Sequence, residues 1–135
     1  MTRTWTGPRN VRNLVDSCGW LEFVNSGPNA EFFGPVLRDR DNLVVSSICI
    51  YEVSRKMMEK LSRLETSRLV SDMRRAHVVE GSEELALSAA SLSRKHGLGM
   101  ADAIIFATAQ SEGAIVWTQD DDFARLPGVK YRKRR

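Results

Sequence analysis

The chain has 135 residues, the usual length of a single domain. Hydrophobic residues make up 42% of the composition and charged residues 27%, as in soluble globular proteins with one apolar core. No apolar run approaches the roughly 20 residues that a membrane span needs, and residues 1–10 contain no hydrophobic stretch typical of signal peptides. We expect a cytoplasmic protein without membrane contact, in which residues 1–10 form a flexible polar extension.

The positive charge of the chain is concentrated at its C-terminal end. The net charge is +3, from 20 basic and 17 acidic residues. Five of the basic residues lie in the last six positions, so the rest of the chain has 15 basic residues against 17 acidic ones, a charge of −2. The domain that we expect over residues 11–131 is therefore not a strongly basic nucleic-acid binder. The basic tail, residues 132–135, either steers a polyanion towards the domain or is a solvated end.

The two cysteines give no indication of a zinc site or a disulfide. Cys18 and Cys49 lie in apolar segments, without a CxxC pair or a histidine cluster nearby. We interpret them as small buried thiols in a reducing compartment.

Apolar spacing predicts an alternation of strands and helices. The predicted strands, in chain order, are 12–16, 43–48, 77–79, 114–118 and 129–131. The predicted helices are 19–24, a helical stretch ending near 38, 49–64, 67–75, 82–96, 100–110 and a short one at 121–125. This order favours an α/β fold, a three-layer α/β/α sandwich with a central parallel sheet. Ligands of such sheets bind beyond the carboxyl ends of the strands.

Four acidic residues from four separate segments are predicted at that edge. Asp16 ends the first strand, and Asp120 follows the strand 114–118. Glu52 is placed in the first turn of the helix after the second strand, and Asp102 begins a helix on the face that points into the core. Carboxylates that converge in this way repel one another and need a divalent cation, such as Mg²⁺ or Mn²⁺.

A pair of such cations could clamp a phosphodiester and activate a water for its hydrolysis. The hydroxyls of Ser17 and Thr118 flank the acids and could support a carboxylate or a metal-bound water. The sequence has no GxxxxGK phosphate loop, no GxGxxG after the first strand and no GxSxG elbow that would indicate other chemistry.

Each acid also has a purely structural interpretation. Asp16 could cap the turn that follows it, and Asp120 could cap the short helix at 121–125. Glu52 and Asp102 could simply favour the positive ends of their helices. The coincidence of four acids at strand ends favours the metal site.

Four stretches of the chain, VDSCGWLEFV, VSSICIYEVSRK, ADAIIFATA and WTQDDDFARLPGVKY, together resemble a PIN domain. More narrowly, they resemble the VapC toxins of bacterial type II toxin–antitoxin pairs, over about residues 11–131. The resemblance implies that the residues Asp16, Glu52, Asp102 and Asp120 are catalytic metal ligands, with Thr118 as the supporting hydroxyl. It also implies a Mg²⁺- or Mn²⁺-dependent endoribonuclease that cleaves structured RNA such as tRNA and arrests translation. The implied partners are a second copy of the chain and a cognate VapB-like antitoxin.

The chain departs from the family pattern at a few positions. Cys18 and Cys49 stand where hydroxyl residues are common, and Gln119 and Asp121 stand where basic residues often occur. None of these departures removes a ligand. Asp122 is a possible substitute for Asp120.

Three other functions remain open from the sequence. A PIN nuclease could act in RNA processing or DNA repair instead of as a toxin, and the same fold could serve as a catalytically silent binding module. An aspartyl-phosphate enzyme with Asp16 as nucleophile is disfavoured, because that chemistry usually has a second acid two residues on, where this chain has Cys18.

Overall fold

The structure is a computed structural model, and it describes residues 11–135. The extension that we predicted over residues 1–10 lies outside the described residues.

The centre of the fold is a five-stranded sheet in which every pair of neighbours is parallel. The strands are β1 (Arg12–Val15), β2 (Leu43–Ser46), β3 (His77–Val79), β4 (Ala114–Thr118) and β5 (Val129–Tyr131). Their order across the sheet is β3-β2-β1-β4-β5. Leu14 of β1 pairs with Val44 of β2 on one side and with Val116 of β4 on the other. All three side chains are fully buried, as expected for a parallel sheet that is covered on both faces.

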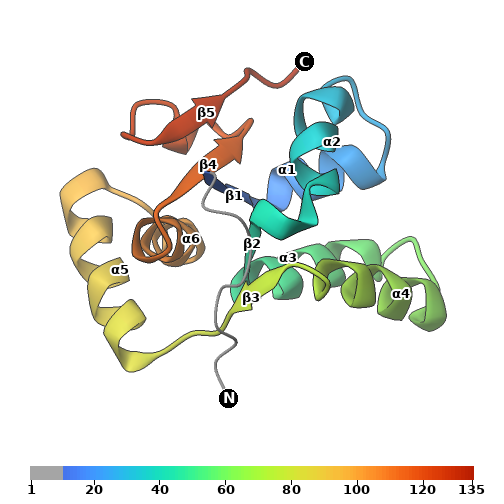
Figure 1. Cartoon of the computed structure of the whole chain (residues 1–135), viewed down its shortest axis with the longest axis horizontal. Coiled ribbons are helices and arrows are strands. Elements are labelled where there is room, and N and C mark those ends of the chain that lie inside the picture. The colour runs from blue at the N-terminus through green and yellow to red at the C-terminus, as the bar shows by residue number, and fades with distance from the viewer. Residues whose placement is uncertain (1–10) are drawn as a thin grey trace.

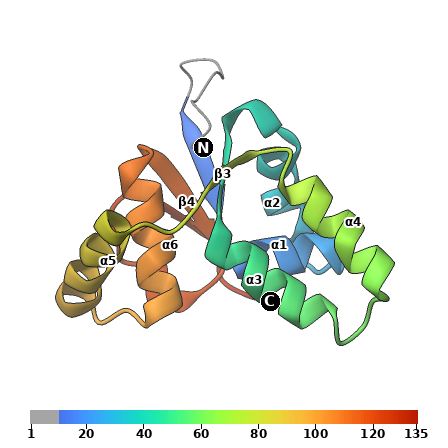
Figure 2. The same cartoon turned by 90° about the horizontal axis from the view of Figure 1, so that it is seen from below.

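The helices cover both faces of this sheet. They are α1 (Ser17–Val24), α2 (Ala30–Arg38), α3 (Ser47–Met57), α4 (Arg63–Met73), α5 (Glu83–His96) and α6 (Met100–Ser111), with short 3-10 turns η1 (Arg40–Asn42) and η2 (Asp121–Phe123). The chain steps from β1 to β2 to β3 through α1–α4, and then crosses back to β4 through α5 and α6. Right-handed crossovers in opposite directions place these two groups of helices on opposite faces. Figures 1 and 2 show α5 and α6 on one side of the strands and α1, α2 and α4 on the other. The predicted three-layer sandwich is confirmed.

The core lies on both sides of the central strands. Phe33 of α2 is fully buried on one face, and Phe106 of α6 is buried on the other. Helix α6 is rich in buried alanines, whose small side chains allow a helix to approach its neighbours closely. Among residues 11–135, no helix combines the length and the apolar composition that a membrane crossing would require.

The predicted helix 49–64 is wrong in its extent. Helix α3 ends at Met57, and α4 begins at Arg63, four residues before the predicted start at 67. A capping box sets the start of α4. The Ser62 hydroxyl accepts the backbone N–H of Glu65 at 3.1 Å, and the Glu65 carboxylate accepts the N–H of Ser62 at 3.2 Å. The sequence S-x-x-E at these positions carries this signal.

The predicted strand 43–48 is also too long. It ends at Ser46, and α3 begins at Ser47. Glu52 therefore lies in the second turn of α3, not in the first as predicted. At that position it gains little from the positive end of the helix, because that effect falls off within the first turn. A purely helix-stabilising role for Glu52 loses its physical basis.

Candidate active site

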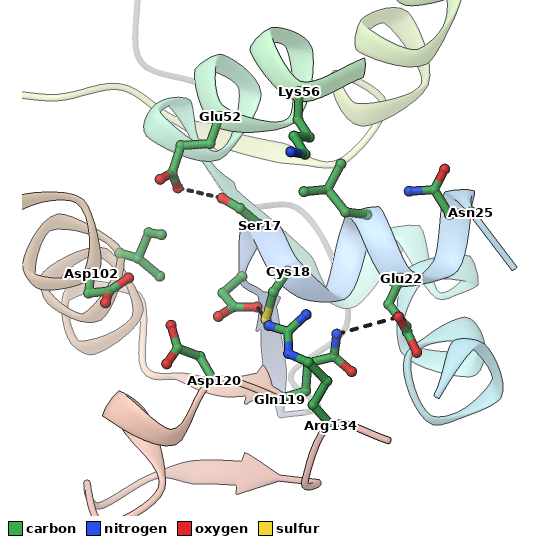
Figure 3. Close-up of a pocket in the computed structure, with 13 residues that line it drawn as sticks. Ser17, Cys18, Glu22, Asn25, Glu52, Lys56, Asp102, Gln119, Asp120 and Arg134 are labelled. Carbon is green, nitrogen blue, oxygen red and sulfur yellow. Dashed lines mark hydrogen bonds between the residues drawn. The ribbon is translucent and has the colours of Figure 1, made fainter. Parts of the chain in front are cut away.

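The four predicted acids line one pocket at the carboxyl ends of the central strands. Asp16 directly follows β1, and Asp120 lies just beyond the end of β4, its neighbour in the sheet. From β1 the chain builds the sheet outward to β2 and β3 on one side, and it later adds β4 and β5 on the other side. Ligands of open α/β sheets bind at the point where the strand order reverses in this way. Glu52 reaches the pocket from α3 and Asp102 from α6 (Figure 3). The pocket has a volume of about 410 Å³.

Asp16 is held by hydrogen bonds to both of its carboxylate oxygens. Its Oδ1 accepts the Gly19 N–H at 3.1 Å and the Cys18 thiol at 2.8 Å, and its Oδ2 accepts the Thr118 hydroxyl at 2.7 Å. The side chain is 3% exposed. Burial is the largest influence on the pKa of Asp16 and raises it. The three donors lower the pKa in part, and the charge of Asp120 raises it further.

Gly19 lets α1 pass close to the sheet directly after this acid. A Cβ atom at Gly19 would lie 2.4 Å from Cγ1 of Val15 and 2.8 Å from the ring of Phe33. Such distances are far inside van der Waals contact, so only glycine fits the space. The contact fixes the first turn of α1, and with it the N–H that binds Asp16.

Thr118 joins two of the acids. Its buried hydroxyl donates to Asp16 and accepts the backbone N–H of Asp120 at 2.9 Å. The hydroxyl predicted to support the site therefore fixes Asp16 relative to the backbone at Asp120.

Ser17, the other predicted supporting residue, binds Glu52. Its hydroxyl donates to Oε1 of Glu52 at 2.6 Å (Figure 3). This bond ties the first residue of α1 to the second turn of α3. Like Thr118, Ser17 holds a carboxylate in place.

Asp102 has no comparable support. Among residues 11–135, no group donates a hydrogen bond to its side chain, which lies in the first turn of α6. Burial is the largest cause of a rise in its pKa to about 7. The other causes are the charges of neighbouring carboxylates, which are, in decreasing order of effect, Asp120, Asp16, Asp122 and Glu52. Negative charge at this position is therefore uncompensated.

Three aspartates next to each other could hold a cation. One oxygen from each of Asp102, Asp120 and Asp122 lies within 4.8 Å of the others. This cluster and the pocket lining share Asp102 and Asp120, whereas Asp122 is exposed and lies at the rim. Asp120 also caps η2, because its Oδ1 accepts the N–H of Asp122 at 2.9 Å. Carboxylate oxygens are the ligands that hard divalent cations prefer, so these donors fit such an ion.

The thiol of Cys18 takes the place of a hydroxyl as a hydrogen-bond donor. Burial, followed by the charge of Asp16 and the hydrogen bond to it, raises the pKa of Cys18. Cys18 is therefore a neutral S–H at physiological pH and keeps its hydrogen bond to Asp16. Burial likewise raises the pKa of Cys49, which is fully buried.

The capping roles proposed for Asp16 and Asp120 are real, and both residues also line the pocket. Glu22 and Asn25 also line the pocket, although they were not predicted as site residues. They follow Cys18 at helical spacing and so share its face of α1. Arg134, which was not predicted either, reaches the pocket from the C-terminal tail (Figure 3). No local pattern indicates the path of that tail.

The fold is shared with several solved structures of low sequence identity. A toxin–antitoxin complex from Klebsiella pneumoniae contains a chain that is 23% identical, with a TM-score of 0.75 over 87% of this chain and 95% of the other. The Mycobacterium tuberculosis toxin VapC20, described as cleaving the sarcin–ricin loop, is 17% identical, with a TM-score of 0.72 over 88% and 98%. A DNA-bound VapBC complex from Salmonella typhimurium gives 22% identity and a TM-score of 0.66 over 92% and 98%.

No curated protein sequence matches the chain. The family model of the PIN domain, however, matches residues 14–129, which include all four acids of the pocket and nearly the whole described sheet. The chain therefore belongs to the PIN domain family.

Proposed function

We propose that this protein is the toxin of a type II toxin–antitoxin pair and acts as a divalent-metal-dependent endoribonuclease in the cytoplasm. The observation that carries the proposal is the set of four carboxylates, Asp16, Glu52, Asp102 and Asp120, around one pocket. Burial is the largest cause of the raised pKa of Asp102, and repulsion from the neighbouring carboxylates raises it further. A bound cation would remove that repulsion.

The donor set favours Mg²⁺ or Mn²⁺ over softer metals. Asp102 and Asp120 would hold the metal, together with Asp16 and Glu52, and Asp122 offers a further oxygen at the rim. A metal bound there would lower the pKa of an attacking water and neutralise charge on the phosphate and on the leaving oxygen.

The protein itself contributes fixed positions. Thr118, Gly19 and Cys18 hold the carboxylate of Asp16, and Ser17 holds that of Glu52. Ligands that are already fixed lose little conformational freedom when a metal and a phosphodiester arrive. In the proposed reaction a water oxygen attacks phosphorus and the bond from phosphorus to the leaving ribose oxygen breaks.

An RNA substrate, such as tRNA or another structured RNA, is supported by the family and by the described activity of the tuberculosis neighbour. The pocket is open to solvent beside the basic C-terminal end of the chain, a charge that attracts a polyanion.

A VapB-like antitoxin and a second copy of the chain are the proposed partners. Several neighbours in structure are toxin–antitoxin complexes. Large apolar side chains are exposed on several helices, with Leu87 of α5 67% and Met100 of α6 76% exposed. Apolar side chains at this exposure are available for burial between proteins. Light scattering of the purified protein, alone and coexpressed with the product of an adjacent gene, tests both partners.

The direct test is cleavage of total RNA by the purified protein with Mg²⁺, with Mn²⁺ and with a chelator. The inactive control is Asp102→Asn. No described residue donates a hydrogen bond to the Asp102 side chain, so the substitution breaks none. Discrete products that require metal and disappear in the variant are expected. Folded, metal-loaded and antitoxin-free protein that yields no products would overturn the proposal and favour a silent binding module.

A further inference from the structure

The last residues of the chain form a strap that is anchored beside the acidic pocket. The backbone N–H of Arg132 donates to the carbonyl oxygen of Thr118 at 3.0 Å, which continues the pairing of β4 with β5 beyond Tyr131. The guanidinium of Arg132 lies 4.7 Å from the centroid of the Phe32 ring, within cation–π range. Residue 132 is therefore fixed by both its backbone and its side chain.

A buried asparagine anchors the next residue. Nδ2 of Asn29 donates to the carbonyl oxygen of Lys133 at 3.1 Å and to Oε1 of Gln119 at 3.0 Å. Asn29 is 1% exposed and Gln119 is 2% exposed, so the bond between them is shielded from water, whereas the bond to Lys133 is partly buried. The backbone N–H of Asn29 is in turn bound by Glu22 at 2.7 Å. The carbonyl of Lys133 thus binds a buried side chain, and the exposed basic end is anchored to the domain up to this residue.

These anchors direct Arg134 into the pocket. Its side chain lines the pocket together with Cys18, Gln119 and Asp120 (Figure 3). Five carboxylates and two cations line the pocket, and Lys56, the other cation, is 3.6 Å from the carboxylate of Glu59 outside it. Within residues 11–135, Arg134 forms no ion pair and donates no side-chain hydrogen bond, so its donors are available to a ligand.

We propose that Arg134 is a substrate-binding residue that holds a phosphate of the RNA over the acidic pocket, with residues 132–133 as the strap that positions it. This inference rests on the proposed function. A guanidinium presents a planar fork of donors that matches two phosphate oxygens, and it keeps its charge at any physiological pH. A strap built to block the acids would instead use those donors in ion pairs with the carboxylates. The unused donors beside the uncompensated acids fit a site shared by a metal, a phosphodiester and an arginine.

The test compares Arg134→Ala with Arg135→Ala in the full chain. Both variants remove one positive charge from adjacent tail residues, but only Arg134 lines the pocket. We expect Arg134→Ala to lower kcat/KM for RNA cleavage by about 10- to 100-fold, the usual effect of one charge-assisted hydrogen bond. We expect Arg135→Ala to stay within about twofold, the level set by a distant screened charge. Arg134→Lys should recover part of the loss, because it restores the charge without the fork.

A binding measurement keeps the inference testable if the protein cleaves no RNA. Fluorescence anisotropy of a labelled single-stranded RNA is measured on Asp102→Asn protein that also carries Arg134→Ala or Arg135→Ala. Weaker RNA binding with Arg134→Ala than with Arg135→Ala supports the inference, even where absent cleavage has refuted the nuclease proposal. Equal effects of the two variants in both assays would overturn it. Faster cleavage, or a lower metal requirement, in Arg134→Ala would also overturn it and make the strap an inhibitor of its own site.

Discussion

The two sides of the acidic pocket differ in how the protein treats its carboxylates. On the side of β1 and α3, Asp16 and Glu52 each accept a short hydrogen bond from a hydroxyl. On the side of α6, Asp102 accepts none from the described residues, and its pKa is raised to about 7. The first side is a fixed platform whose geometry the fold has already determined. The second side carries a charge that no hydrogen bond from the described residues stabilises, so the two sides should respond differently to the same substitution.

The largest expected effect is the loss of cleavage in Asp102→Asn. Removing one of the carboxylates that we propose as metal ligands should lower kcat by about 10²- to 10³-fold or more. The same substitution should leave the free energy of unfolding unchanged or raise it, because repulsion from four neighbouring carboxylates is relieved. RNA cleavage and urea unfolding of the metal-free protein measure the two effects. Cleavage at the wild-type rate would remove Asp102 from the metal site.

The matching substitution on the other side, Asp16→Asn, should also abolish cleavage but should destabilise the fold. An amide NH₂ at one of the Asp16 oxygens would face the donors of Thr118, Gly19 or Cys18. A buried donor left without a partner costs about 1–3 kcal/mol. Because of the hydrogen bonds to Asp16, an intact or slightly stabilised fold is expected only for the Asp102 variant. Equal unfolding midpoints for the two variants would contradict the division of the pocket into two sides.

The side of the pocket that holds Asp16 depends on the close approach of α1 to β1, which Gly19→Ala should prevent. The added methyl would meet Val15 and Phe33 at under 3 Å, and overpacking of this kind costs about 1–3 kcal/mol. Gly81→Ala is the control, because a Cβ there has no neighbour within 4 Å and the backbone is not left-handed. Its stability should change by less than about 1 kcal/mol. Thermal unfolding of both variants is the measurement, and a Gly19→Ala protein as stable as the control would show that α1 can move away from β1.

The difference between the two sides also explains what the sequence could predict. Asp16 and Asp120 were found because each follows an apolar strand, a signal carried by a few adjacent residues. Glu52 was predicted in the first turn of its helix but lies in the second. The reason is that Ser46, the last residue of β2, and Ser47, the first of α3, are the same residue type and do not mark the boundary. The sequence indicated Ser17 and Thr118 as supporting hydroxyls, but it could not assign Thr118 to Asp16, since the two residues are 102 positions apart. That pairing depends on the register of β1 against β4, which only the folded sheet defines.

The C-terminal tail illustrates the same limit. The sequence left open whether residues 132–135 are solvated or serve a polyanion, because a run of basic residues fits both. The contacts that anchor the tail come from Asn29, 104 positions from Lys133, and from the ring of Phe32. Neither residue carries a local sign of such a role.

The side of Asp102 should also give the stability of the protein a dependence on pH. In the folded protein the pKa of Asp102 is about 7, against 3.8 for an unperturbed aspartate. Between these values the native state binds more protons than the unfolded state, so this carboxyl lowers the free energy of unfolding as the pH rises from about 4 to about 7. Asp102→Asn should lose this part of the pH profile in metal-free protein. Mg²⁺ should stabilise the wild type at pH 8, by about 2.7 kcal/mol at a free concentration of 100 times Kd. It should stabilise less as the pH falls below 7, because protons then compete for Asp102. Unfolding curves at several pH values with Mg²⁺ and with chelator test this, and a stabilisation by Mg²⁺ that is independent of pH would place the cation away from Asp102.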